Sequence, residues 1–118
     1  MSSEVPIRII TEPMSRLEAG EFGKVWYVDL VKGVVDLEDG TLALGGEYHM
    51  DANLVLLEKG SSQENIWGFN IYPERTGDSW IEFISLINIR PAAGNRTMEV
   101  EDEGIRSQMR ALIEKLIV

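Results

Sequence analysis

The dipeptide Asp39-Gly40 constrains the fold more than any other feature of this sequence. It lies between two runs of apolar and β-branched residues, at positions 25–37 and 41–50. An Asp-Gly pair in that setting favours a two-residue hairpin turn, because both turn positions adopt a positive φ. Along the second run, apolar side chains at even positions alternate with small and polar ones at odd positions, as on the two faces of a strand. The sequence therefore predicts an antiparallel hairpin over residues 25–50.

Further strands are expected on either side of this hairpin. Residues 7–10 form a short β-branched run that suits an edge strand, and residues 54–58, 65–72 and 80–90 predict three more strands. Gly33 interrupts the first arm of the hairpin and is expected to mark a β-bulge. Because consecutive strands joined by short turns usually pair with each other, the expected product is an antiparallel meander.

Two helices are expected to flank the sheet. The C-terminal one follows an acidic segment at 101–103 that suits a helix start, and its apolar residues recur at helical spacing: Ile105, Met109, Leu112, Ile113, Leu116 and Ile117. A shorter helix is expected between Thr11, which can cap it, and Gly23. The predicted fold is α+β: an antiparallel β-meander with a C-terminal amphipathic helix and a short N-terminal helix packed on one face, in a single domain of residues 1–118.

Composition narrows the class of protein. The 118 residues carry 11 positive and 20 negative side chains, and the net charge of −9 argues against binding to nucleic acid or an anionic membrane. The chain has no Cys and one His, which excludes disulfides, thiolate nucleophiles and a multi-histidine zinc site. No apolar run approaches the length of a membrane span, and no signal peptide is recognisable. We expect a cytoplasmic protein without a cofactor.

Three runs carry a resemblance to a known family: GEYHMD at 46–51, QENIWG at 63–68 and NIRP at 88–91. With their flanking segments, from about residue 32 to residue 117, they resemble a small family of prokaryotic proteins catalogued only as a domain of unknown function. The resemblance implies a stand-alone prokaryotic domain. It transfers no activity and no catalytic residue.

The hairpin brings together a first set of candidate site residues. A turn at 39–40 would place Lys32 opposite Glu47, and would put Glu47, His49 and Asp51 on one face of the second strand. A histidine between two carboxylates is expected to have a raised pKa, and the three side chains could serve as an acid/base pair or hold a divalent metal ion. The alternative is a solvated sheet face, on which Lys32 and Glu47 form a surface ion pair of little energetic value.

A second set of polar residues surrounds the segment 91–94: Asn88, Arg90, Asn95 and Arg96. Two arginines beside a glycine-containing loop could form a small pocket for a carboxylate or phosphate, since the guanidinium fork matches both groups. Alternatively, Asn95 serves a turn and the arginines fix the loop by bonding backbone carbonyls or the nearby acidic residues 99–102.

The aromatic residues of the segment 65–72 form a third candidate. Trp67, Phe69 and Tyr72 could line a ligand groove or a partner surface, but aromatic residues in strand positions more commonly belong to the core. Asn70 lies inside this apolar strand, and a buried amide there needs hydrogen-bond partners.

The sequence thus leaves two functional hypotheses. The first is a protein-interaction or self-associating module, which an exposed sheet edge would suit. The second is a small enzyme or a protein that binds an anionic ligand or a metal, with Glu47, His49 and Asp51 acting together with Arg90 or Arg96. No residue set names a reaction, so enzymatic activity stays open.

Overall fold

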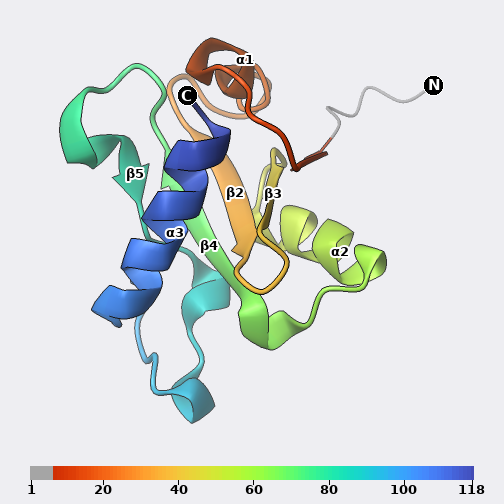
Figure 1. Ribbon diagram of the computed structural model, residues 1–118, viewed down its shortest axis with the longest axis vertical. Coiled ribbons are helices and arrows are strands. Elements are labelled where there is room, and N and C mark those ends of the chain that lie inside the picture. Colours follow the sequence, from red (N-terminus) through yellow and green to blue (C-terminus); the bar gives the residue numbers. More distant parts are fainter. Residues whose placement is uncertain (1–6) are drawn as a thin grey trace.

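Five antiparallel strands form a single sheet in the computed structural model, which describes residues 7–118 (Figure 1). The strands are β1 (Arg8–Ile10), β2 (Val31–Asp36), β3 (Thr41–Leu44), β4 (Ile66–Ile71) and β5 (Ile81–Glu82). Their spatial order is β1-β3-β2-β4-β5. The hairpin β2–β3 therefore lies at the centre, with β4 on the other side of β2.

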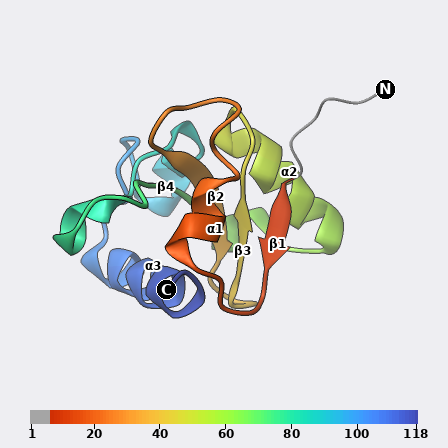
Figure 2. The same cartoon turned by 90° about the horizontal axis from the view of Figure 1, so that it is seen from above.

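Helices cover both faces of this sheet. The three α-helices are α1 (Arg16–Gly20), α2 (His49–Lys59) and α3 (Glu103–Leu116). Figure 2 shows α3 on one side of the strands and α2 on the other. Short 3-10 turns occupy Gln63–Asn65, Gly77–Trp80, Leu86–Asn88 and Pro91–Ala93. The predicted α+β class is confirmed, including the antiparallel sheet, the C-terminal helix and the short N-terminal helix; α2 was not expected.

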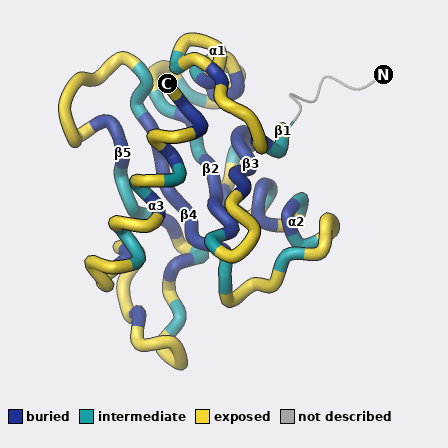
Figure 3. Tube along the Cα trace, viewed as in Figure 1, coloured by how far each residue is buried: buried dark blue, intermediate teal, exposed yellow. Residues whose placement is uncertain are grey.

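The larger core lies between the sheet and α3. Alternate residues of β2 and β4 point to this side, among them Val35 and Phe69, and pack with Met109 and Ile113 of α3. Every second side chain of the strands faces this core, and so do the apolar side chains of α3 that recur at the helical period of 3.6 residues. Figure 3 shows the consequence as buried strands surrounded by exposed connections.

The C-terminal residues meet the segment between β1 and α1 on this same face. The N–H of Met14 donates to the carbonyl of Leu116 at 2.8 Å, and the N–H of Val118 donates to the carbonyl of Met14 at 2.8 Å. Ser15 then caps α1 by accepting the N–H of Glu18. In Figure 1 the C-terminus accordingly lies beside α1.

The other face of the sheet carries a smaller core beneath α2. Val34, Ala43 and Ile66 of the three central strands pack against Ala52 and Leu56 of the helix. Residues 52 and 56 are one helical turn apart, so both face the sheet. Among residues 7–118, none of the helices combines the length and the apolar character needed to cross a membrane.

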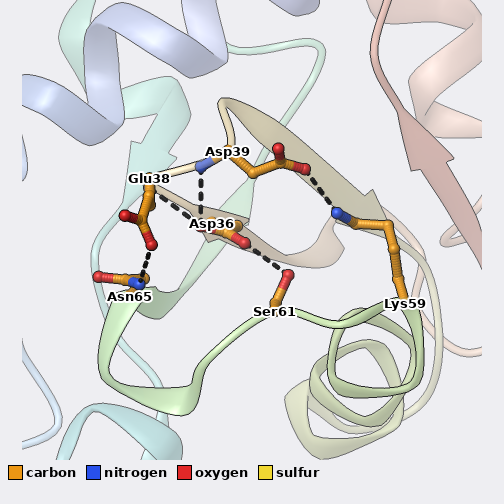
Figure 4. Close-up of polar contacts among 6 residues, drawn as sticks. All are labelled: Asp36, Glu38, Asp39, Lys59, Ser61 and Asn65. Carbon is orange, nitrogen blue, oxygen red and sulfur yellow. Dashed lines mark hydrogen bonds and ion pairs between the residues drawn. The ribbon is translucent and has the colours of Figure 1, made fainter.

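The hairpin forms at the predicted place but with a longer turn. Asp36 pairs with Thr41, so the connection spans residues 37–40 rather than 39–40 alone. The carboxylate of Asp36 accepts the N–H groups of Glu38 and Asp39, and this internal bonding closes the wider loop (Figure 4). The bulge predicted at Gly33 is wrong: Gly33 pairs regularly with both neighbouring strands, and its role is steric, since a Cβ there would lie 2.6 Å from Phe69 Cζ.

The same polar cluster ties the hairpin loop to the end of α2. The Ser61 hydroxyl donates to Asp36, Lys59 pairs with Asp39, and Asn65 donates to Glu38 (Figure 4). These contacts link residues that are 20 to 27 positions apart in the chain. The loop of the hairpin is thereby held against the segment that leads from α2 to β4.

The strand predicted at 41–50 ends at Leu44, and the strand predicted at 54–58 is wrong, because residues 49–59 form α2. β3 ends at Leu44, and the next two residues adopt positive φ values of 115° and 94° that glycine tolerates. The carboxylate of Asp51 then accepts the N–H of Tyr48 at the helix start. Strand propensity in this segment is overridden by burial of the α2 face on the sheet.

The long strand predicted at 80–90 is also wrong, since β5 ends at Glu82. Ser85 interrupts extended structure by accepting the N–H of Ile87 and starting a 3-10 turn. The segment is held instead by bonds to residues 98–100, including the N–H of Ser85 to the carbonyl of Met98 at 3.0 Å. Its residues 84–87 lie on the α2 face and form one wall of a cavity there.

Candidate functional site

A cavity of about 440 Å³ opens on the α2 face of the sheet. β2 and β4 form its floor, the start of α2 forms one wall, and the segment 84–87 forms the other. The lining residues are Lys32, Tyr48, His49, Met50, Asn70, Ile84, Ser85, Leu86, Ile87 and Met98. We call this the His49 cavity, because it holds the single histidine of the chain.

His49 is the first residue of α2 and is only 8% exposed. Its Nε2 lies 2.9 Å from the carbonyl oxygen of Phe69. A carbonyl oxygen can only accept, so Nε2 carries the proton in the neutral ring. The pKa of His49 is lowered to about 4, mainly by burial. The positive charge of Lys32 also lowers it, and hydrogen bonding to Phe69 and Asn70 acts in the opposite direction.

This direction is opposite to the raised pKa that the sequence suggested. The prediction assumed an exposed histidine between two carboxylates on a strand. In the structure the ring is buried, and Lys32 is the charged group that acts on it. His49 is therefore a neutral imidazole at neutral pH.

Asn70 is the second polar side chain of the cavity, and it is 8% exposed. Its Nδ2 donates to Glu82 Oε1 at 3.1 Å and to the carbonyl oxygen of Ile84 at 3.4 Å. Two acceptors on that side fix the orientation of the amide. Within residues 7–118, its Oδ1 is buried without a hydrogen-bond partner. The Tyr72 hydroxyl donates to the same Glu82 oxygen at 3.0 Å and holds that carboxylate in place.

Lys32 supplies the positive charge of the cavity. It is half-buried on β2, directly opposite Asn70 of β4. Its Nζ lies 5.2 Å from the ring centroid of Tyr27 and 5.8 Å from that of Tyr48. These distances suit cation–π contacts. In the described part of the chain, no carboxylate forms an ion pair with Lys32.

The structure separates Glu47 and Asp51 from His49. Glu47 precedes α2, where its backbone carbonyl accepts the hydroxyl of Tyr27, and Asp51 caps the start of the helix. Neither side chain lines the His49 cavity. Because α2 replaces the expected strand, the three residues do not share a sheet face, and Lys32 does not face Glu47. No group of three metal-ligating side chains gathers among residues 7–118.

Arg90 and Asn88 bond to backbone within the fold. The guanidinium of Arg90 lies 4.2 Å from the ring centroid of Trp67 and donates to the carbonyls of Ile87, Glu64 and Ile66. Burial lowers the pKa of Arg90. Asn88 is fully buried; its Oδ1 accepts the N–H of Gly68 at 2.8 Å, and its Nδ2 donates to the carbonyl of the same residue at 3.1 Å.

Asn95 and Arg96 belong to the loop that follows. Asn95 Nδ2 donates to three carbonyls, those of Asn88, Thr97 and Glu99. Arg96 is exposed, and its backbone N–H donates to Glu101 Oε2 at 2.9 Å. Neither arginine lines the His49 cavity, so the structure does not bring the two predicted residue sets into one site.

Comparison with known proteins agrees with the resemblance seen in the sequence. A family model described as "Protein of unknown function (DUF5674)" matches residues 8–116. The chain belongs to the DUF5674 family. It has no significant match among the curated proteins or the solved structures.

In this DUF5674 chain, sequence reasoning found part of the cavity and missed the rest. It singled out Lys32 and His49, and it noted that an amide at position 70 would need partners. It missed Tyr48, Met50 and the wall at 84–87, because these meet only through α2 and the 3-10 turn. The signal for α2 was Gly45 and Gly46 followed by an acidic residue at 51, which is a strand end and a helix start.

Two of the three aromatic residues considered for a groove belong to the core. Trp67 and Phe69 lie in the larger core beneath α3, on the face opposite the His49 cavity. Tyr72 is half-buried and bonds Glu82. The core interpretation of the strand aromatics is therefore correct for Trp67 and Phe69.

Proposed function

We propose that this protein binds a small, mostly apolar molecule with an anionic end group in the His49 cavity. One observation carries the proposal: the cavity has largely apolar walls and, at its base, a cation that pairs with no described carboxylate. Ligand sites in proteins commonly combine an apolar lining with a few placed polar groups.

The walls provide the apolar contact. Leu86 is 72% exposed, and Met50 and Met98 are also exposed at the cavity mouth. Ile84 and Ile87 continue this lining inward. A ligand seated here removes apolar surface from water on both sides, which is favourable by about 25 cal/mol for each Å² covered.

Lys32 provides selectivity for charge. An ammonium group that is half-buried between two tyrosine rings has lost part of its hydration and gains from an anionic partner. The overall charge of −9 disfavours anions at long range, so a bound anion needs this local cation.

Binding of benzenesulfonate tests the proposal. It is an apolar ring with a permanently charged group, and its titration into ¹⁵N-labelled protein should shift the amide signals of residues 48–50 and 84–87 in a saturable manner. Lys32→Met should weaken this binding at least tenfold. Lys115→Met, which removes an exposed lysine from α3 on the other face, should leave it unchanged. Absence of saturable shifts at the cavity would refute the proposal.

Protein association is the second candidate function, as a different surface favours it. Val28 is 99% exposed and Leu17 is 79% exposed, and both line a smaller cavity of about 200 Å³ beside α1. Exposed apolar groups of this kind suit a partner or a second copy of the chain. Light scattering of the protein and of a Leu17→Glu, Val28→Glu variant tests this. A monomeric mass for both proteins at high concentration would refute self-association.

A further inference from the structure

The lining of the His49 cavity holds a buried hydrogen-bond acceptor that the neutral ring does not serve. The Nε2 proton is used by the carbonyl of Phe69. Asn70 lines the same cavity as His49, and its side chain raises the pKa of the ring, which favours the protonated form. Since two acceptors on its other side hold Asn70 Nδ2, the group of Asn70 that lacks a partner is Oδ1.

A partner for Asn70 Oδ1 can come from another side chain of the same cavity. Its Oδ1 is fully buried, so a ligand in the cavity does not reach it directly. A buried acceptor without a donor costs about 1–3 kcal/mol, so a donor that reaches Asn70 Oδ1 is favourable. A protonated imidazole has a second N–H and could satisfy Phe69 and Asn70 at once.

We infer that an anion bound in the His49 cavity is taken up together with a proton, and that His49 receives this proton and bonds both Phe69 and Asn70. The inference rests on the function proposed above and deepens it. The ligand is then an anion whose binding strengthens as the pH falls. A neutral molecule of the same shape does not have this property.

The charged groups around His49 explain why an anion is required. Lys32 on β2 is the charge that acts directly on the ring, and it opposes protonation. Tyr48 at the start of α2 lines the same cavity, and Glu82 on β5 accepts a hydrogen bond from Asn70 Nδ2. The segment 84–87 and Met98 bring no titratable side chain. Burial is the main reason that the ring stays neutral, and an anion beside Lys32 offsets the charge repulsion that adds to it.

The single histidine makes the test direct. Its imidazole proton signals in the ¹H NMR spectrum report one ring, so the protonation midpoint of His49 can be followed in the intact protein. The probes are benzenesulfonate and its neutral counterpart benzenesulfonamide, each at saturation. We expect benzenesulfonate to raise the midpoint by at least one pH unit and benzenesulfonamide to leave it unchanged. By linkage, that rise corresponds to binding about tenfold tighter at low pH than at pH 7.5.

A second measurement identifies the acceptor. In Asn70→Leu, the rise in the His49 midpoint at saturating benzenesulfonate should be smaller than in the wild-type protein. Calorimetry of the wild-type protein in two buffers of different ionisation enthalpy should show net proton uptake on binding near pH 5.5. This readout does not depend on whether the variant folds.

The possible failures are distinguishable. If neither probe binds in the cavity, both the proposed function and the inference about His49 are wrong. If benzenesulfonate binds without moving the midpoint, the cavity is an anion site but the coupling to His49 is refuted. An equal rise with benzenesulfonamide would also refute the coupling, because the charge of the ligand would then play no part.

Discussion

The burial of His49 as a neutral ring should make the stability of this protein depend on pH. The folded state holds the pKa of His49 at about 4, against an ordinary value of 6.5. The unfolded chain therefore binds a proton more readily than the folded chain between these two values. Above pH 6.5 the contribution of His49 is constant, and as the pH falls from 6.5 to about 4 the folded state loses stability.

The size of this effect follows from the same two values. The full difference corresponds to about 3 kcal/mol of unfolding free energy, at 1.36 kcal/mol for each pH unit. Only part of it is lost in an accessible range: between pH 7.5 and pH 5, we expect a loss of about 2 kcal/mol from this group alone. That is a large share of the stability of an ordinary small domain.

The assay compares the wild-type protein with His49→Gln. Glutamine keeps a side-chain N–H donor for Phe69 but does not titrate. Urea unfolding at several values between pH 7.5 and pH 5 gives the unfolding free energy of each protein. Carboxylates titrate in both proteins, so their contribution cancels in the difference. The wild-type protein should lose about 2 kcal/mol more than the variant over this range. Parallel curves would refute the argument that His49 is buried and neutral.

Three further predictions concern the supports of the cavity, and each is checked by urea unfolding. Gly68→Ala should destabilise the protein by about 1–3 kcal/mol, since the new Cβ would lie 2.6 Å from Ser85 Cβ; unchanged stability would contradict this contact. Asn88→Ala should cost about 3 kcal/mol by leaving the buried backbone groups of Gly68 unpaired, and a loss under about 1 kcal/mol would contradict their burial. Arg90→Met should lower stability by about 1–2 kcal/mol without changing benzenesulfonate affinity, because the guanidinium bonds carbonyls outside the cavity. A weaker affinity for benzenesulfonate would show that Arg90 does contribute to the anion site.

The polar residues in and near the cavity serve two different roles. Asn88 and Arg90 lie close to the cavity wall in sequence, yet their bonds go to backbone groups that β4 and the segment 63–66 would otherwise leave unpaired. Lys32 and Asn70 lie on the sheet face beneath α2, and each keeps capacity for a further contact. The two pairs of residues are equally polar, and only their interaction partners distinguish them.

The sequence by itself determined the elements whose signals are local. The apolar stripe of α3, the acidic cap at Asp102 and the hairpin near Asp39-Gly40 depend on residues within a few positions of one another. The predicted helix and the hairpin are both present, and only the turn length differs, because Asp36 bonds two N–H groups of the loop.

Only the tertiary structure decided the segment after the hairpin. Its branched and aromatic residues suit a strand, but the chain turns at Gly45 and Gly46 and gains more by burying Ala52 and Leu56 of a helix against the free face of the sheet. Those contacts reach β2 and β4, which are distant in sequence, so no local pattern contains them.

The chemistry of His49 depends on the same long-range choice. A histidine near two carboxylates in sequence is expected to be basic, and the local pattern contains nothing else. In the folded protein the ring meets a carbonyl from β4 and a lysine from β2, and α2 buries it away from water. The amino-acid sequence therefore determined which groups can titrate. Packing between distant segments determined that the pKa of His49 is lowered rather than raised.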